Sequence, residues 1–494
     1  MSILEDLDLH HARLIPALGI GRGAEQEERA TSALLAVLGI VPSFGKRILK
    51  YLGAPAGKIT TYTEPHLETS DGTTGIPDGL IHVQRGKSEW VALVEVKTGS
   101  NHLDSDQINL YLQIANGLGY NAVLTISNEI VASPSESPVN IDKRKTKKVT
   151  VAHISWSRIM TEAVTEFEHR GVDDPEQAWI LNELIAYLDA EKSGASGYEG
   201  MGKEWVRVRD AAKQRTLDTS TPGVTDVAGD WEQFVEYLAL KLRQRLGRKV
   251  EPSYPRSSTG DSRLKENVES LTRGESILEA TIKVPDAAAP IYLQANLARR
   301  QVTTSTKVSA PSGKERAKTR LNWMMRQLKD TPNDLRIEVH FKGTRTTITN
   351  MVEKVRDKPD LLLLPADPRR EPTAFTLAVT RDMGSKRGKG QGSFVKLAMD
   401  QTIGFYRDVL QKVDKYVAPA PKLEAEPEPE EDEKPKRVAP TPDPTTDTDG
   451  DGLSDHDERH VYQTDPIRTD TDGDGVNDHD EIFNTGTDPN VHDK

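Results

Sequence analysis

Apolar side chains in the first 200 residues follow two alternating patterns. Residues 24–38 carry Ala30, Ala33, Leu34, Val37 and Leu38 at the three-and-four spacing that is typical of a helix. Residues 90–96, WVALVEV, form a nearly continuous β-rich run, as expected of a strand that is buried on both faces. The same patterns predict strands at 79–83, 121–127 and 149–156, and helices at 104–117, 157–168 and 175–191. This alternation predicts a mixed α/β layer around a central sheet.

A polar stretch rich in Gly, Thr and Asp, at about 212–230, predicts a linker to a second unit. That unit spans residues 231–417 and has the pattern of an α+β domain. We expect helices at 231–246, 314–329 and 395–413, and strands at 277–283, 290–297, 302–308, 335–342 and 373–380. The pattern alone identifies no particular fold for this unit.

The last part of the chain differs from both units. Residues 418–446 alternate Pro with Glu, a composition that cannot bury a core and favours an extended, self-repelling linker. Beyond it, DTDGDGLSDHDE (447–458) recurs as DTDGDGVNDHDE (470–481), which is a repeat with a 23-residue period.

Composition narrows the class of protein. The absence of cysteine excludes disulfides and thiolate metal sites, and no apolar run approaches the roughly 18 residues that would cross a bilayer. The acidic start lacks the pattern of a signal peptide, so a cytoplasmic protein that uses no membrane is expected. The net charge of −12 conceals a basic middle, because residues 231–421 hold 35 Lys and Arg against 22 Asp and Glu.

Three charged residues stand at the ends of two predicted strands. Asp78 precedes the strand at 79–83, while Glu95 and Lys97 lie two residues apart at the end of the apolar run, so their side chains share one face. A buried sheet has no structural reason to accept these charges. Two carboxylates beside a lysine suit Mg²⁺-dependent hydrolysis of a phosphodiester, since Mg²⁺ prefers oxygen ligands and lowers the pKa of a bound water.

The segments GIPDGLIHV, WVALVEVKTG and DSDQINLYLQIA resemble the PD-(D/E)XK nuclease superfamily over about residues 24–160. The resemblance implies a restriction-endonuclease-like mixed sheet flanked by helices, and an Mg²⁺ (or Mn²⁺) site held by Asp78 and Glu95. It makes Lys97 a catalytic residue that orients the water, neutralises the phosphate or, with a depressed pKa, acts as a base. It also implies accessory roles for Glu28 and Gln107, with Tyr111 on the same helical face as Gln107.

Other interpretations of these residues stay open. Asp78, Glu95 and Lys97 could form a surface ion-pair cluster, or belong to a domain of this fold that binds nucleic acid without cutting it. Gln107 and Tyr111 could simply cap or pack a helix, and Glu28 could lie on a solvated face beside Glu25 and Glu27.

Each C-terminal repeat fits the calcium-loop pattern D-x-D-x-D-G-x5-E, with Gly452 and Gly475 at the sharp turn. The expected Ca²⁺ ligands are Asp447, Asp449, Asp451, Asp455 and Glu458 in the first repeat, and Asp470, Asp472, Asp474, Asp478 and Glu481 in the second. Pro466 and the short spacing exclude a helix–loop–helix pair. The repeats resemble thrombospondin type 3 and related bacterial calcium repeats, which implies that metal replaces a hydrophobic core.

Basic clusters in the second unit favour phosphate binding through counterion release. They lie at 241–249, Arg299–Arg300, 314–320 and 386–389, and no helix–turn–helix or zinc pattern accompanies them.

The leading interpretation is a metal-dependent endonuclease for DNA, in preference to RNA, possessing a nuclease-like domain (1–220), a basic domain (231–417) and a tail with two calcium repeats (447–494). A role in bacterial restriction or phage defence is inferred only from the class of enzyme that the chain resembles. The rival is a non-catalytic nucleic-acid or partner-binding protein with a calcium-organised tail, and a third is an exported adhesin-like protein. The sequence leaves homo-oligomerisation open.

Overall fold

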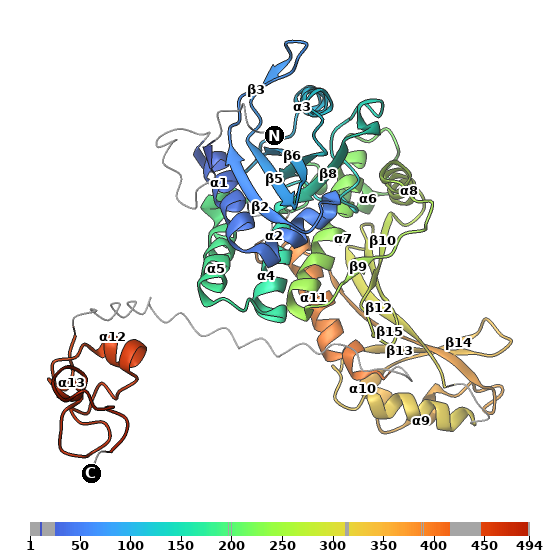
Figure 1. Ribbon diagram of the computed structural model, residues 1–494. Coiled ribbons are helices and arrows are strands. Elements are labelled where there is room, and N and C mark those ends of the chain that lie inside the picture. Colours follow the sequence, from blue (N-terminus) through green and yellow to red (C-terminus); the bar gives the residue numbers. More distant parts are fainter. Residues whose placement is uncertain are drawn as a thin grey trace. The chain divides into compact units, whose positions relative to one another are not determined.

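The computed structural model describes residues 10–11, 25–195, 197–198, 200–311, 316–386, 388, 390–414 and 446–492. The chain divides into two compact units, Met1–Glu424 and Ala425–Lys494 (Figure 1). Most of the predicted Pro/Glu linker, together with Lys314, Arg387 and Lys389 of the basic clusters, lies outside the described residues.

A six-stranded mixed sheet forms the centre of the first half of the larger unit. Its strand order is β1-β2-β5-β6-β7-β8; β2, β5 and β6 are antiparallel, whereas β6, β7 and β8 are parallel. The strands are β1 (His10–His11), β2 (Lys58–Thr63), β5 (Gly79–Arg85), β6 (Ser88–Val96), β7 (Ala122–Ser127) and β8 (Thr150–Ser155). Between β2 and β5 the chain forms a small separate hairpin of two strands, β3 (Leu67–Glu68) and β4 (Thr74–Gly75). The mixed α/β layer expected from the sequence is confirmed.

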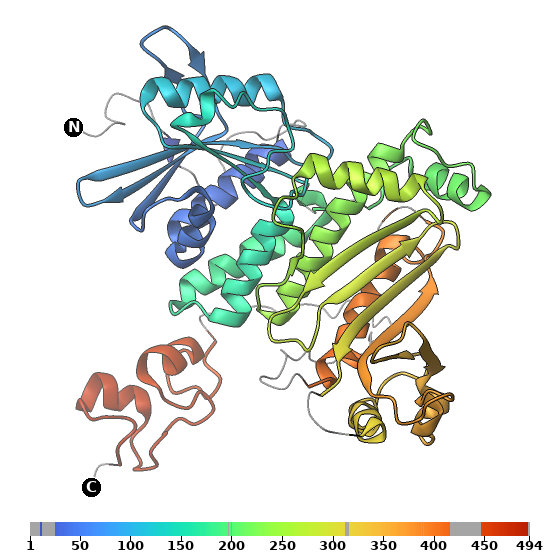
Figure 2. The ribbon, with the colours of Figure 1, turned by 90° about the vertical axis from the view of Figure 1, so that its right-hand side faces the viewer.

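Helices cover both faces of this sheet (Figure 2). One face packs against α1 (Glu25–Ile40), α2 (Pro42–Leu49), α4 (Trp156–Val164) and α5 (Pro175–Asp189). The other face packs against α3 (Ser105–Leu118), which Asp104 caps by accepting a hydrogen bond from Asp106 N. Gly79 permits the close approach of α1 to β5, because a Cβ there would lie 2.4 Å from Leu35 Cδ1.

A seven-stranded antiparallel sheet forms the centre of the second half, in the order β14-β13-β15-β12-β11-β10-β9. Its strands are β9 (Glu251–Pro252), β10 (Ile277–Lys283), β11 (Ile291–Asn296), β12 (Gln301–Ser309), β13 (Arg336–Phe341), β14 (Thr347–Met351) and β15 (Pro372–Asp382). Side chains alternate along β12, where Val302, Thr304, Thr306 and Val308 are buried and their neighbours are not. The buried face packs on helices, and the polar face is turned toward the viewer in Figure 2, with α11 (Phe394–Asp408) behind it.

The boundary between the two halves differs from the prediction. The core of the first half ends at Ala195, and from Tyr198 onward the buried side chains belong to the core of the second. The expected linker at 212–230 is wrong in part, since α6 (Trp205–Gln214) and α7 (Val224–Leu246) occupy both of its ends. The remaining helices of this half are α8 (Gly260–Thr272), α9 (Ala317–Gln327) and α10 (Val352–Val355).

Buried charges join the two halves through α4 and α7. Arg243 of α7 donates a hydrogen bond of 2.7 Å to Glu162 Oε1, and Tyr51 donates one of 2.5 Å to the same oxygen. The Glu162 side chain is fully buried, and Arg47 contributes a more distant contact of 3.8 Å to its other oxygen. The two sheets therefore share a fixed ionic junction within one compact unit.

No single helix among the described residues is long and apolar enough to cross a membrane. The successive segments Glu25–Ile40 and Pro42–Leu52 would suffice together, but they are bent by 111°. Residues 30–38 are buried in the core of the first half, which accounts for their apolar character.

The smaller unit consists of loops with two short helical segments, α12 (Asp455–Asp457) and α13 (Asp478–Asp480), each continued by a wider turn. Leu453 and Pro489 are the buried apolar side chains among its described residues. So few buried apolar side chains mean that the smaller unit lacks a hydrophobic core of its own.

Candidate functional site

The ends of β5 and β6 bring Asp78 and Glu95 together. Gly79 pairs with Val94 in the antiparallel register, so the residues just beyond them, Asp78 and Glu95, are neighbours across the same two strands. Asp78 Oδ2 accepts a hydrogen bond of 2.6 Å from Val96 N, and Glu95 is fully buried. The backbone register thus converts a separation of 17 positions in sequence into a close carboxylate pair.

Lys97 extends from the end of β6 toward two carboxylates. Its Nζ donates to Glu95 Oε1 at 2.5 Å and to Glu27 Oε1 at 3.1 Å, which confirms that Glu95 and Lys97 point to one face. Lys97 N continues the sheet ladder by donating to Ile126 O, and Trp156 Nε1 donates to Lys97 O. The lysine is therefore held at both its backbone and its ammonium group.

Burial raises the pKa of both carboxyl groups, and a neighbouring carboxylate adds to it in each case, Asp78 at Glu95 and Glu27 at Asp78. Burial and the charge of Asp78 raise the pKa of Glu95 to about 8, despite the opposing contact with Lys97. Burial also raises the pKa of Asp78, against the hydrogen bond from Val96. A strongly perturbed acidic pair at the edge of a sheet is a common property of functional sites.

The expectation that the pKa of Lys97 could be depressed is wrong. Burial acts to lower the pKa of Lys97, but the hydrogen bond to Glu95 and the charges of Glu95, Asp78 and Glu27 outweigh it and raise the value. Lys97 is therefore an ammonium group around neutral pH, suited to neutralising negative charge and not to accepting a proton.

The acid that α1 contributes is Glu27, and not the predicted Glu28. Besides its contact with Lys97, Glu27 Oε2 accepts hydrogen bonds from Thr98 N at 3.3 Å and Asn101 Nδ2 at 3.4 Å. No hydrogen bond or ion pair joins Glu28 to this cluster in the described part of the chain. The sequence contained a signal for Glu27, because counting back along the apolar stripe of Leu34 by seven residues reaches it.

Gln107 and Tyr111 lie on one face of α3, as predicted, and contact each other. Gln107 Nε2 donates to Tyr111 Oη at 3.1 Å, and Tyr111 Oη donates to Ile76 O at 2.9 Å. Burial and the charges of Glu95 and Asp78 raise the pKa of Tyr111 to about 12. Tyr111 thus lies within electrostatic range of the carboxylate pair and stays protonated, while Gln107 positions its hydroxyl.

The residues present fit a divalent cation with a preference for oxygen. Glu95 Oε2 is buried and has no hydrogen-bond partner in the structure, which is costly for a carboxylate unless a ligand or a proton compensates it. Asp78 Oδ2 is used by the backbone, which leaves the second oxygen of Asp78 for a ligand. Among the described residues, however, groups of three acids close enough to share one ion occur only in the C-terminal unit.

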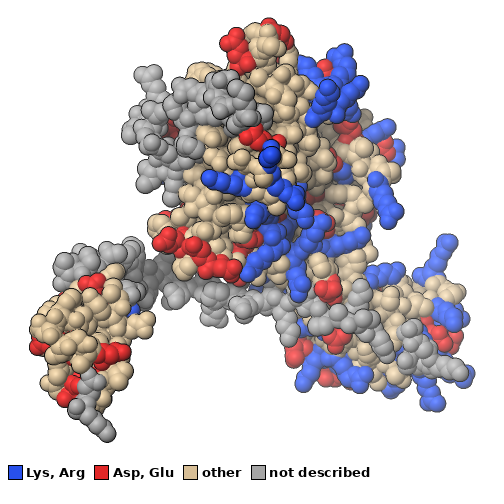
Figure 3. Space-filling view, in the orientation of Figure 1, with Lys and Arg blue, Asp and Glu red and all other residues tan. Residues whose placement is uncertain are grey.

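The predicted basic clusters divide into buried and exposed residues. Arg243 and Arg320 are buried and bond within the protein, Arg243 to Glu162 and Arg320 to Pro372 O. Arg245, Arg248 and Lys249 are exposed at the end of α7. Lys and Arg side chains gather over this end and the neighbouring α2 in Figure 3. Lys249 pairs with Glu251 at 2.9 Å, so part of the positive charge is used within the protein and part lies at the surface.

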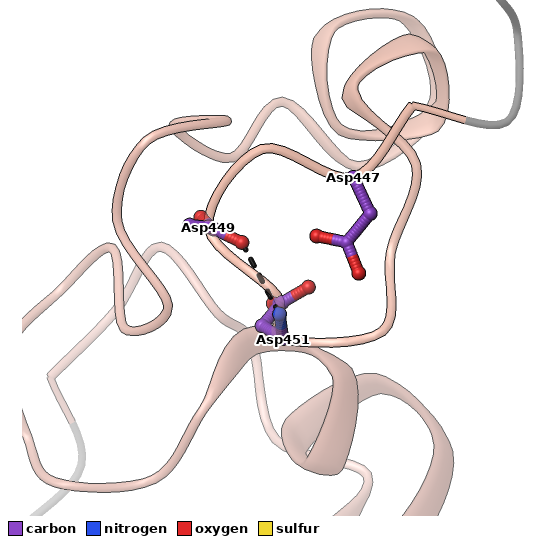
Figure 4. Close-up of side chains that lie close together, drawn as sticks. All are labelled: Asp447, Asp449 and Asp451. Atoms are coloured by element: carbon purple, nitrogen blue, oxygen red, sulfur yellow. Dashed lines mark hydrogen bonds between the residues drawn. The ribbon is translucent and has the colours of Figure 1, made fainter.

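The first calcium repeat turns its acids toward one another. Asp447, Asp449 and Asp451 point inward from one loop (Figure 4), and one oxygen of each lies within 4.8 Å of the others. Asp449 Oδ2 and Asp451 Oδ2 are buried without a hydrogen-bond partner. Gly452, with φ of 104°, makes the sharp turn, and its N–H donates to Asp447 Oδ2 at 3.1 Å.

The second repeat has the same local design. Asp470, Asp472 and Asp474 form a second inward-facing group, and Gly475 N donates to Asp470 Oδ2. Glu458 and Glu481, at the last position of each loop, are fully buried, and Oε2 of each has no hydrogen-bond partner. Burial and neighbouring aspartates raise the pKa of Glu458 to about 7. Such uncompensated carboxylates indicate cation sites, and calcium accepts this many oxygen ligands.

Asp455 and Asp478, predicted as equivalent ligands, each accept hydrogen bonds from the threonine at the corresponding position of their own repeat. Asp455 accepts hydrogen bonds from Thr448 N and Thr448 Oγ1, and Asp478 accepts the corresponding pair from Thr471. Only Asp478 also belongs to a group of converging acids, and that group includes Asp451 and Glu458 of the first repeat.

Comparison with known families agrees with this geometry. Residues 447–469 and 470–491 match the bacterial TSP3 repeat, so both repeats are of a calcium-binding type. A search of curated proteins finds no match to the chain.

Proposed function

We propose that the protein is a divalent-metal-dependent nuclease that hydrolyses phosphodiester bonds of DNA, with Asp78, Glu95 and Lys97 as its active centre. The observation that carries the proposal is the pair of half-buried Asp78 and fully buried Glu95, in which Glu95 Oε2 has no partner, beside a lysine held as a cation. A structural ion pair would not need a second carboxylate at the same place.

The topology supports the proposal. A helix, an antiparallel β2–β5–β6 meander, α3 and then β7 parallel to β6 follow one another along the chain, with the acids at the β5 and β6 ends. This is the arrangement expected of a restriction-endonuclease-like fold. Because one fold can carry many activities, the proposal still depends on the acidic pair and the lysine.

Each residue has a distinct chemical task in this proposal. Asp78 and Glu95 would hold Mg²⁺ or Mn²⁺, which supplies a more acidic bound water and polarises the phosphate. Water forms one P–O bond as the bond to the leaving oxygen breaks. Lys97, as an ammonium group, neutralises the charge that develops on the non-bridging oxygens. Glu27 positions Lys97 from the opposite side through its contact of 3.1 Å.

The second half supplies surfaces for the nucleic acid. Exposed Arg245, Arg248 and Lys249 add positive charge beside α2, and the open face of the seven-stranded sheet carries polar and basic side chains. On that face the cross-strand register places Tyr292 opposite Ser305, and Arg336 opposite Ala378. A hollow of about 350 Å³ lies there, lined by both Tyr292 and Arg336. Among the described residues, Arg336 is the one cation and Glu279 the one acid that line this hollow, and an exposed tyrosine beside an arginine suits base stacking and phosphate contact.

Cleavage assays on the full chain test the proposal. Supercoiled plasmid, single-stranded DNA and RNA are incubated in Mg²⁺, Mn²⁺, Ca²⁺ and EDTA with wild type, Lys97→Ala and Lys87→Ala. We expect nicking in Mg²⁺ or Mn²⁺, and loss of at least about 100-fold in Lys97→Ala, the scale of removing one group that stabilises transition-state charge. Lys87 is exposed in the β5–β6 turn and serves as the matched control.

Binding assays separate the proposal from its rival. If wild type and Lys97→Ala cut equally, or neither cuts any of the three substrates in either metal, the nuclease proposal is wrong. Retention of DNA by both proteins in gel-shift experiments, without cleavage, would support a non-catalytic nucleic-acid-binding protein. The acidic centre would then be a structural ion pair.

A further inference from the structure

The two C-terminal repeats are alike in sequence but not in their surroundings. Gly452 and Gly475 occupy the same loop position, with φ of 104° and 100°. A Cβ at Gly452 would lie 3.2 Å from His479 of the second repeat, whereas a Cβ at Gly475 would meet nothing within 4 Å. The last part of the second loop therefore packs against the first loop.

That segment brings Asp478 to the acids of the first repeat. One oxygen each of Asp451, Glu458 and Asp478 lies within 4.8 Å of the others, close enough for a single ion to contact all three. Asp478 and Glu458 are both fully buried, and Asp451 also belongs to the group formed with Asp447 and Asp449.

A second observation points to a cation at this place. Glu458 has no exposed surface, and its Oε2 lacks any hydrogen-bond partner, as does Asp451 Oδ2 beside it. A buried carboxylate oxygen without a donor costs free energy that a bound cation would recover. Hydrogen bonds from Thr471 fix the orientation of Asp478, so its carboxylate is already positioned.

We propose that Asp478 of the second repeat is a ligand of the calcium ion bound by the first repeat, so that the first site is complete only when the second repeat is folded against it. The loop pattern assigns Asp478 to its own repeat, and the structure adds the contact across repeats. Asp478 and its equivalent Asp455 differ in this respect, although each accepts the same two hydrogen bonds from a threonine. This inference does not depend on the proposed nuclease activity.

The experiment is a Ca²⁺ titration of the full chain labelled with [¹⁵N]glycine, followed by NMR. The amides of Gly452 and Gly475 donate to the first aspartate of their own loops, so each amide reports on its own site. Asp447→Asn and Asp470→Asn distinguish the two signals. Each titration yields a midpoint for each loop in wild type, Asp478→Asn and Asp455→Asn.

We expect Asp478→Asn to raise the Ca²⁺ midpoint of Gly452 at least tenfold, and Asp455→Asn to raise it less than threefold. Asp455→Asn is the comparison variant, because it weakens the equivalent threonine contacts, and a contact of 3.6 Å with Arg459, but removes no member of the converging group. Asp470→Asn keeps Asp478 and weakens the second loop, so any rise that it causes in the Gly452 midpoint measures how far the first site depends on the folded second repeat; we expect that rise to be no larger than the one in Asp478→Asn.

Two outcomes would overturn the proposal. The first is a Gly452 midpoint that stays within twofold of wild type in Asp478→Asn while only Gly475 responds, which would show two self-contained loops. The second is an effect of Asp455→Asn on the Gly452 midpoint that equals the effect of Asp478→Asn, which would show that membership of the converging group has no weight.

Discussion

The carboxylates at the β5–β6 strand ends and those in the C-terminal loops solve the same electrostatic problem in different ways. At the strand ends, Lys97 and the backbone N–H of Val96 compensate one oxygen each of Glu95 and Asp78 from within the fold, and Glu95 Oε2 is left without a partner. In the loops, backbone amides cover part of the aspartates, but buried oxygens of Asp449, Asp451, Asp472, Glu458 and Glu481 have no partner. The first arrangement can persist without an ion and exchange it, while the second depends on an ion for its structure.

Removal of calcium tests the largest difference between the two regions. We expect chelation by EDTA to lower the protection of amides in residues 446–492 against hydrogen exchange by about 100-fold or more, equivalent to about 2.7 kcal/mol of bound-ion stabilisation. The reason is that Leu453 and Pro489 are the buried apolar side chains among the described residues of this unit. Exchange measured by mass spectrometry provides the comparison.

The amides of β5 and β6 are the internal control for that measurement. Their protection should change little on chelation, because their stability comes from the apolar core of the first half. Equal protection of the C-terminal loops with and without calcium would contradict the comparison, since it would mean that the loops hold their shape unaided.

Replacement of Lys97, the cation of the strand-end site, should make that site depend on a bound ion, as the C-terminal loops do. We expect Lys97→Met to lower the free energy of unfolding in EDTA by about 3 kcal/mol, because it leaves fully buried Glu95 without its cation. Added Mg²⁺ should restore part of this loss. Denaturant unfolding, with Lys87→Met expected to stay within about 0.5 kcal/mol of wild type, provides the measurement. If Lys97→Met unfolds with the free energy of wild type, and Mg²⁺ does not change that value, then Lys97 does not compensate the charge of the Asp78–Glu95 pair.

Glu27 and Glu28 provide the finest test. Glu27→Gln weakens the positioning of Lys97, and we expect it to reduce metal-dependent cleavage about tenfold. A tenfold change corresponds to the loss of one hydrogen bond to a charged group, worth about 1.5 kcal/mol. Glu28→Gln, one residue along α1, should leave the initial rate unchanged. If the two variants have equal rates, the contact between Glu27 and Lys97 has no functional weight.

The strongly apolar elements of the fold could be predicted from the sequence. The predicted strands at 90–96 and 277–283 correspond to β6, a nearly continuous buried run, and to β10, in which apolar side chains recur among polar ones. By contrast, β2 (KITTYT) and α8 (GDSRLKENVESLT) were not predicted. The first is rich in threonine, and the second buries only Arg263 and Leu271, so neither shows a clear apolar stripe.

The site itself divides in the same way. Asp78, Glu95 and Lys97 were predictable as a group, because strand geometry alone places Glu95 and Lys97 on one face. The pKa direction of Lys97 was not, since it depends on how many carboxylates surround the ammonium group. Asp478 was assigned to its own loop because the return of the second repeat onto the first has no signature in a linear pattern.

The ionic junction between the two sheets has a consequence for the history of the chain. Glu162 comes from the first half and Arg243 from the second, and each is buried against the other at 2.7 Å. Exchange of either half for a foreign domain would strand a charge in the interior, at a cost of several kcal/mol. The two halves can therefore be exchanged for foreign domains only as a pair.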